Sequence, residues 1–336
     1  MKTKLILKYG YNWPASWSPL QIEMYAIQKG GKWEVGGQTY GEGLLAHYIN
    51  ARSLAWPKRY FHRWMRLIYE QVLSNQIVVC SGPASAQKTS TLSEIVSLAY
   101  WAFPETTAVL VSTTSVDKLE SAVFGEIKML FKSARELHPW LPGNIIDHKH
   151  AITTDNVKED GVRDMRKGIF GKPLYQGAKY VGQSVYAGIK QERFWWLADE
   201  LQFCPSTLMD CIPNMRSNTG AGGLHILGSG NPNHDPESQL GIIAEPLDGW
   251  VSVEENTKTS VWPIKMDGGV CVNLIGPDSP NFDAPADQPE PYPRLIGREF
   301  YRVIAKDYGI HSPVAETQLW GRMKLGLAHS RVITRQ

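Results

Sequence analysis

Apolar runs and amphipathic stretches alternate along the middle of the chain. Residues 77–79 are β-branched and predict a buried strand, and a helical pattern follows from Lys88 to Ala99. Residues 108–112 predict a second strand, and a long helical pattern runs from Val116 to about Leu137. Strand, helix, strand, helix in this order predicts a parallel sheet with crossover helices.

Further elements are predicted on both sides of this unit. Residues 194–198 form a continuous apolar run, which is typical of a central parallel strand, and residues 224–228 form another. We expect a strand over residues 261–265 and helices over residues 293–308 and 314–325. Ahead of the first strand, residues 56–71 predict a helix with one apolar face. Its other face carries Lys58, Arg59, Arg63 and Arg66 and is interpreted either as solvated or as lying near a nucleotide base.

The loop after the first strand has the pattern of a phosphate-binding loop. Small residues lead from the strand to a helix that opens with a lysine and a threonine, and the loop comprises Gly82, Pro83, Ala84, Ser85, Ala86, Gln87, Lys88, Thr89 and Ser90. Backbone N–H groups and the helix N-terminus would face an anion, the lysine would reach the outer phosphates, and the threonine would bind Mg²⁺. Gln87 replaces the usual glycine, so we expect it in a conformation that costs a Cβ atom little. Taken alone, the loop fits an ordinary strand-to-helix turn equally well.

Polar residues also follow the two later strands. Asp199 and Glu200 come directly after residues 194–198, where P-loop ATPases carry one carboxylate for Mg²⁺ and one for the attacking water. The alternative is an acidic pair at a helix N-terminus, and the upstream loop favours the ATPase interpretation. Ser229, Gly230 and Asn231 end the next strand, and a short polar side chain there can sense a γ-phosphate. Taken alone, residues 229–232 indicate only a turn, and their place as the third polar strand end in chain order makes them informative.

Composition adds little about partners. The 336 residues carry a net charge of +2, so only local clusters can argue for nucleic acid. The four cysteines show no C-x-x-C spacing, and no apolar run approaches a membrane span. We therefore expect a protein without disulfides or membrane segments. His148 and His150 lack a third nearby ligand and are interpreted as surface residues.

Basic and aromatic residues alternate between residues 144 and 188. This pattern, which includes Arg163, Arg166 and Lys167, suits contact with a nucleic-acid backbone and bases, and exposed β-hairpins explain it equally well.

Together, the three strand ends resemble the large terminase subunit of tailed bacteriophages, the ATPase that drives DNA into a capsid. The likeness covers about residues 55–325. The loop at residues 82–89 looks like one of the deviant Walker A loops of that family, Asp199 and Glu200 look like its Walker B end, and residues 229–232 look like its coupling motif. The resemblance implies an α/β P-loop NTPase of the ASCE, RecA-like type, with a central, mostly parallel sheet flanked by helices.

The resemblance also implies roles for individual residues. Lys88 would contact the β- and γ-phosphates of ATP, Thr89 and Asp199 would serve Mg²⁺, and Glu200 would be the catalytic base. Ser229, Gly230 and Asn231 would couple phosphate state to movement. Because the loop carries Ala84 and Ser85 where some terminases have an arginine, an arginine finger would come from a neighbouring subunit, with Arg193 as first candidate and Arg163 and Arg166 as others.

The same resemblance implies the organisation and partners of the chain. Residues 1–55 would be an N-terminal extension of unknown role, residues 56–326 the ATPase domain, and residues 327–336 a connector toward a nuclease domain that this chain lacks, so no DNA cleavage is expected. The expected partners are double-stranded DNA, a portal protein, a small terminase subunit and further copies in a ring, in the host cytoplasm and transiently on the procapsid. The alternative function is a P-loop nucleotide switch or DNA-binding scaffold with weak turnover.

We predict that replacing Arg163, Arg166 and Lys167 together with alanine weakens duplex DNA binding. Each lost phosphate contact should also flatten the slope of log affinity against log salt by about 0.9. Fluorescence anisotropy of labelled duplex over a salt series measures both effects. An unchanged salt slope would remove this segment from the DNA path.

Overall fold

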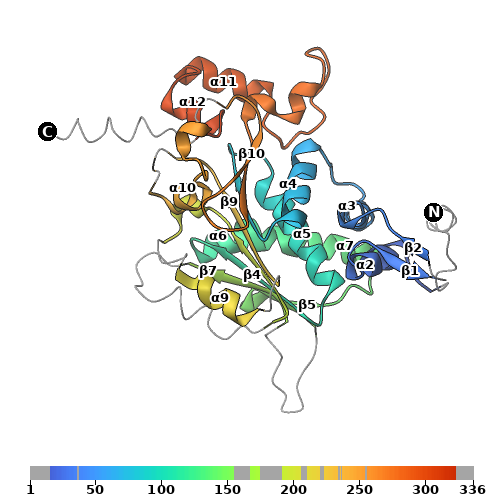
Figure 1. The fold of residues 1–336 in the computed structure, drawn as a ribbon. Coiled ribbons are helices and arrows are strands. Elements are labelled where there is room, and N and C mark those ends of the chain that lie inside the picture. The colour runs from blue at the N-terminus through green and yellow to red at the C-terminus, as the bar shows by residue number, and fades with distance from the viewer. Residues whose placement is uncertain are drawn as a thin grey trace.

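The computed structural model describes residues 16–35, 38–154, 167–174, 191–205, 210–219, 223–233, 235, 237–253 and 256–322, with only the backbone described at residues 33–35 and 38–40. In these ranges a sheet of nine strands forms the centre, in the order β10-β11-β3-β9-β8-β4-β7-β6-β5 (Figure 1). The α/β fold with a central, mostly parallel sheet is therefore confirmed.

Six adjacent strands of this sheet are parallel. They are β11 (Gly269–Asn273), β3 (Ile77–Ser81), β9 (Leu224–Gly230), β8 (Arg193–Ala198), β4 (Thr107–Thr113) and β7 (Gly168–Pro173). Antiparallel strands complete both edges, namely β10 (Ser260–Pro263) on one side and β6 (Ala151–Thr153) and β5 (Asn144–Ile146) on the other. Because parallel strands share one direction, the ends of β3, β9 and β8 meet at the same edge of the sheet.

Successive residues of the central strands point into two different cores, as period-two alternation requires. On one face, Val78 and Cys80 of β3 join helices of the first half of the chain. These helices are α2 (Pro19–Gln28), α3 (Leu44–Ala55), α4 (Arg63–Ser74), α5 (Lys88–Ala102) and α7 (Phe124–Leu137). On the other face, Ile77 and Val79 join α9 (Ile212–Asn218) and α10 (Gln239–Ala244). Helices thus cover both faces of the sheet (Figure 1).

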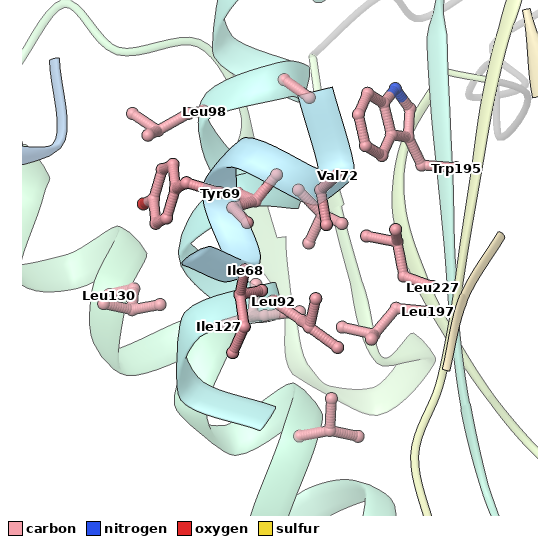
Figure 2. Close-up of a cluster of buried hydrophobic side chains, with 14 of the residues drawn as sticks. Ile68, Tyr69, Val72, Leu92, Leu98, Ile127, Leu130, Trp195, Leu197 and Leu227 are labelled. Atoms are coloured by element: carbon pink, nitrogen blue, oxygen red, sulfur yellow. The ribbon is translucent and has the colours of Figure 1, made fainter. Parts of the chain in front are cut away.

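The first of these cores holds α5 against the sheet. Figure 2 shows Leu92 of α5 among side chains of α4, α7, β8 and β9, including Ile68, Ile127, Leu197 and Leu227. All five side chains are fully buried. Close packing from four elements fixes α5, and therefore the loop that precedes it, relative to the strand ends.

The N-terminal segment belongs to the same core. Leu20 and Met24 of α2 and Tyr48 and Ala51 of α3 are buried in it. The short hairpin of β1 (Trp33–Val35) and β2 (Gln38–Tyr40) connects these helices. The described part of the predicted extension is therefore packed structure, although its role stays open.

Several predicted boundaries were wrong. The helix expected over residues 56–71 begins only at Arg63, because Trp56–His62 connects α3 to α4. The helix expected from residue 293 is α11 (Arg298–Tyr308), and the last helix is α12 (Pro313–Gln318) rather than residues 314–325. α11 and α12 lie side by side at one end of the molecule, coloured orange to red in Figure 1.

Other features were predicted only in part or not at all. Strand β11 was not predicted. One of the two interpretations of residues 144–188 was exposed β-hairpins, and β5 and β6 do pair as antiparallel strands, but together with β7 they belong to the central sheet. The helical pattern after β4 is interrupted, since α6 (Val116–Lys118) passes into a π-helical turn, Leu119–Val123, before α7.

The expectations about cysteines and membranes can be checked on the described residues. Cys80, Cys204, Cys211 and Cys271 are all buried and free. Among the helices of the described part of the chain, none is long and apolar enough to cross a membrane.

Candidate functional site

The three predicted strand ends converge on one cavity of about 440 Å³. Register explains the convergence: Cys80 of β3 lies opposite Ser229 of β9, and Ala198 of β8 lies opposite Gly228. The loop after β3 and the residues after β8 and β9 therefore leave the sheet together. The lining residues are Ala84 to Ser90, Ser121, Ala122, Glu126, Asp199, Glu200, Gly230 and Asn231.

Lys88 links the loop to the end of β9. Its ammonium group donates hydrogen bonds to the carbonyls of Gly82 at 2.9 Å and Pro83 at 2.8 Å, and to Oδ1 of Asn231 at 2.9 Å. Gly82 and Pro83 thus hold the lysine and do not line the cavity. Burial lowers the pKa of Lys88 to about 8, although the Asp199 carboxylate opposes this shift.

Asp199 joins all three strand ends. Its Oδ1 accepts a hydrogen bond from the Thr89 hydroxyl at 2.9 Å and a second one from the Ser229 hydroxyl. Burial raises the pKa of this carboxyl, while the bonds from Ser229 and Thr89 pull it down. The Thr89 hydroxyl and the Asp199 carboxylate, held 2.9 Å apart beside the loop after β3, are hard oxygen ligands. They fit Mg²⁺, which retains several waters and takes few protein ligands.

Gln202 was missed by sequence reasoning and connects the second carboxylate to Asn231. Its side-chain amide donates to Oε2 of Glu200, and its Oε1 accepts the backbone N–H of Asn231 at 3.2 Å. A Cβ atom on Gly230 would lie 2.5 Å from that Oε1, so only glycine leaves room for this arrangement. A glutamine two residues after the acidic pair gives no pattern by which it could have been found.

Left-handed backbone conformations concentrate around the cavity. Gln87 has φ 57°, Ser85 has φ 58° and Glu200 has φ 57°. The expectation that Gln87 adopts a conformation cheap for a Cβ atom is therefore wrong, because the left-handed region costs about 1–2 kcal/mol for such a residue. The neighbouring His62, whose ring lies 3.2 Å from Oε1 of Gln87, and the first turn of α5 hold the loop there.

Arg59 is a second residue that sequence reasoning misplaced. It was expected on a basic helix face and instead lies in the connection before α4, with its side chain only 28% exposed. It donates to Glu94 at 2.7 Å, to Glu126 at 2.7 Å and to the hydroxyl of Ser90. Burial lowers the pKa of Arg59, but the carboxylates of Glu94 and Glu126 outweigh burial and raise the pKa above its usual value. Arg59 also lines a second cavity of about 400 Å³, which shares Gln87, Ser90 and Glu126 with the first.

Of the other predicted cations that the structure describes, neither Arg193 nor Lys167 lines the cavity. Arg193 begins β8 and so lies about 20 Å from Asp199 at the far end of the strand. Its guanidinium stacks 3.9 Å from the ring centre of Phe103 and pairs with Glu192 at 2.7 Å. Lys167 pairs with Glu105 at 3.0 Å, and Arg163 and Arg166 lie outside the described residues. Their roles as a finger or as DNA contacts stay predictions.

The histidine cluster provides no metal site. His150 pairs with Glu120 at 2.6 Å, and Asp147 pairs with Lys128 at 2.9 Å. Within the described ranges, no three His, Cys, Asp or Glu residues are grouped to hold a metal ion.

Comparison with solved structures agrees with this architecture. The ATPase domain of the Thermus phage P74-26 large terminase has a TM-score of 0.53 at 11% identity, covering 82% of this chain and 97% of that one. A point mutant of the same domain gives 0.51 at 12% identity, covering 82% and 98%. The large terminase of a thermophilic bacteriophage in complex with ADP gives 0.48 at 15% identity, covering 78% and 53%. The sequence matches no protein-family model and no curated protein.

The order of the central strands and the loop between β3 and α5 define a P-loop NTPase fold of the RecA-like class. Within that class, the chain has the fold of the ATPase domains of phage large terminases. The predicted fold is thereby confirmed.

Because Gln87 has a left-handed backbone conformation, we predict that glycine is more stable than alanine at this position, the reverse of the order in ordinary helices. We expect Gln87→Gly to have a free energy of unfolding about 1 kcal/mol higher than Gln87→Ala, because only alanine keeps the strained Cβ atom. Both variants lose the contact with His62, so it cancels in the comparison. Chemical denaturation followed by circular dichroism measures the difference.

Exposed Ser53 in the last turn of α3 provides the control with ordinary helical backbone. There Ser53→Ala should be about 1 kcal/mol more stable than Ser53→Gly, as in ordinary helices. If alanine is also the more stable residue at position 87, the strain assigned to the loop is absent.

Proposed function

We propose that this chain hydrolyses ATP with Mg²⁺ and couples hydrolysis to the translocation of double-stranded DNA into a viral capsid. One observation carries the proposal: hydrogen bonds join the three strand ends, from Lys88 to Asn231 and from Thr89 and Ser229 to Asp199. Lys88, Thr89, Asp199, Glu200 and Asn231 line a single cavity. The similarity to terminase ATPase domains supports the coupling to DNA.

The roles follow from the positions. The loop N–H groups and Lys88 would hold the phosphates, and Lys88 would exchange its loop carbonyl partners for phosphate oxygens. Mg²⁺, when bound by Thr89 and Asp199, would neutralise charge on the β- and γ-phosphates. Glu200 would accept a proton from the water that attacks the γ-phosphorus, and ADP would leave. The hydrogen bond between Asn231 and Lys88 would change when the γ-phosphate leaves, and Asn231 would in this way sense the loss of the phosphate.

The charge of the cavity supports a further cation from outside the chain. Among its described lining residues, Lys88 is the one cation, against the carboxylates of Glu126, Asp199 and Glu200. A triphosphate adds more negative charge, so its transition state needs additional positive charge. We propose that a neighbouring subunit supplies an arginine within a ring of copies.

The assembly follows from the same proposal. The ring would dock on a portal protein, with a small terminase subunit delivering the DNA. The chain would work in the host cytoplasm and transiently on the procapsid.

The alternative function is a nucleotide switch or DNA-binding scaffold with weak turnover. The strained Gln87 in place of glycine favours it, because the loop has a Cβ atom beside the phosphate position. Steady-state turnover distinguishes the two functions.

We expect Lys88→Ala and Glu200→Gln each to abolish nearly all ATP turnover, since one loses the phosphate contact and the other the base. Glu200→Gln should still bind ATP, because its amide replaces only the proton acceptor. Phosphate release and the binding of a fluorescent ATP analogue measure these effects. The controls are Lys265→Ala and Glu192→Gln, both exposed and away from the cavity. Turnover at the wild-type rate in both site variants would refute the catalytic assignment.

Gln202 gives a second prediction. We expect Gln202→Ala to lower kcat about tenfold and to leave ATP affinity unchanged, because Glu200 loses its orientation and the phosphate contacts remain. Exposed Gln288→Ala is the matched control. A rise in KM with unchanged kcat would show that Gln202 acts on binding instead.

A further inference from the structure

The phosphate cavity continues into the second cavity. Gln87, Ser90 and Glu126 line both, so the two cavities adjoin at the first turn of α5 and are together called the cleft. The far part is lined by Lys58, Arg59, Tyr60, Met65, Glu94, Pro293 and Arg294. A nucleotide with its phosphates on the loop would extend along this cleft, and its sugar would pass the shared residues.

At the junction, three side chains form a closed set. Arg59 donates to both the Ser90 hydroxyl and Oε1 of Glu126, and the Ser90 hydroxyl donates to that same Oε1 at 2.7 Å. Within the described part of the chain, Oε2 of Glu126 accepts no hydrogen bond. The carboxylate is therefore held by one oxygen, and the other has room for a hydrogen bond from a ligand in the cavities that Glu126 lines.

A carboxylate in a phosphate-binding cleft is repelled by the phosphates. It is favourable there only if a nearby cation neutralises its charge and a partner donates a hydrogen bond to it. Arg59 supplies the neutralising charge. In a nucleotide, the hydrogen-bond donors next to the phosphates are the hydroxyls of the ribose. Acidic side chains bind ribose hydroxyls in other nucleotide sites. We propose that Glu126 binds the ribose hydroxyls of the nucleotide and makes the site selective for ribonucleotides, an inference that rests on the proposed ATP site.

Arg59 is then a positioning residue for Glu126. Arg59 is itself held in place by two neighbours. Arg52 donates a hydrogen bond to the carbonyl of Arg59 at 3.1 Å, and Glu94 accepts hydrogen bonds from both arginines. Glu94 is fully buried and also accepts a bond from Tyr69 at 3.3 Å. This network connects α3, α4 and α5, so the side chain of Glu126 meets a rigid partner.

The test compares the binding of ATP with that of 2′,3′-dideoxy-ATP, which keeps the base and the phosphates. We expect the wild-type protein to bind dideoxy-ATP about tenfold more weakly, as for the loss of a hydrogen bond to a charged group. In Glu126→Ala the two affinities should become equal. In Glu126→Gln, which preserves shape and a neutral acceptor, the difference should shrink to about threefold. Competition against a fluorescent ATP analogue measures all of these affinities without turnover.

Glu136→Gln, exposed on the same helix α7, is the control and should retain the full tenfold difference. Equal affinities in the wild type, or an unchanged difference in Glu126→Ala, would overturn the inference while leaving ATP binding intact. Failure of the wild type to bind ATP at all would overturn the proposed function together with the inference. Discrimination between the sugars without hydrolysis would support the inference and refute only the catalytic proposal.

Discussion

The candidate site depends on the buried carboxylate of Asp199. Asp199 directly follows β8. Its carboxylate accepts hydrogen bonds from Thr89 at the start of α5 and from Ser229 near the end of β9. A buried carboxylate is costly without such partners, so the three elements are held in one relative position by its need for hydrogen bonds. The loop, the acidic pair and the polar end of β9 therefore form a single unit.

Strain at this edge of the sheet is balanced by packing elsewhere. Ser85, Gln87 and Glu200 all hold left-handed conformations, each at a cost of about 1–2 kcal/mol. The side chains of α5 between the sheet, α4 and α7 supply the stabilisation that keeps the loop in this form (Figure 2). Strained residues held by a rigid core are typical of active sites and ligand-binding sites.

Two networks extend outward from this unit in different directions. Toward the end of β9, Gln202 and Asn231 connect Glu200 to Lys88, so the groups proposed to act on the γ-phosphate share hydrogen bonds. Toward the N-terminal helices, Arg59 and Glu94 connect Ser90 and Glu126 to α3. The first network suits chemistry at the phosphates, and the second suits recognition of the remainder of the nucleotide.

The sequence by itself determined the central strands, the loop before α5 and the three strand ends, because apolar runs and the polar residues after them are local patterns. It did not reveal β11, nor that β5, β6 and β7 belong to the central sheet, because these short or mixed runs become strands of the sheet only through pairing with neighbours. Nor did it place Arg59, Glu126 and Gln202, because their partners lie on other elements and no spacing along the chain records them. Only the tertiary structure decided these contacts, since buried charges and amides take whichever partner the packing brings within hydrogen-bonding distance.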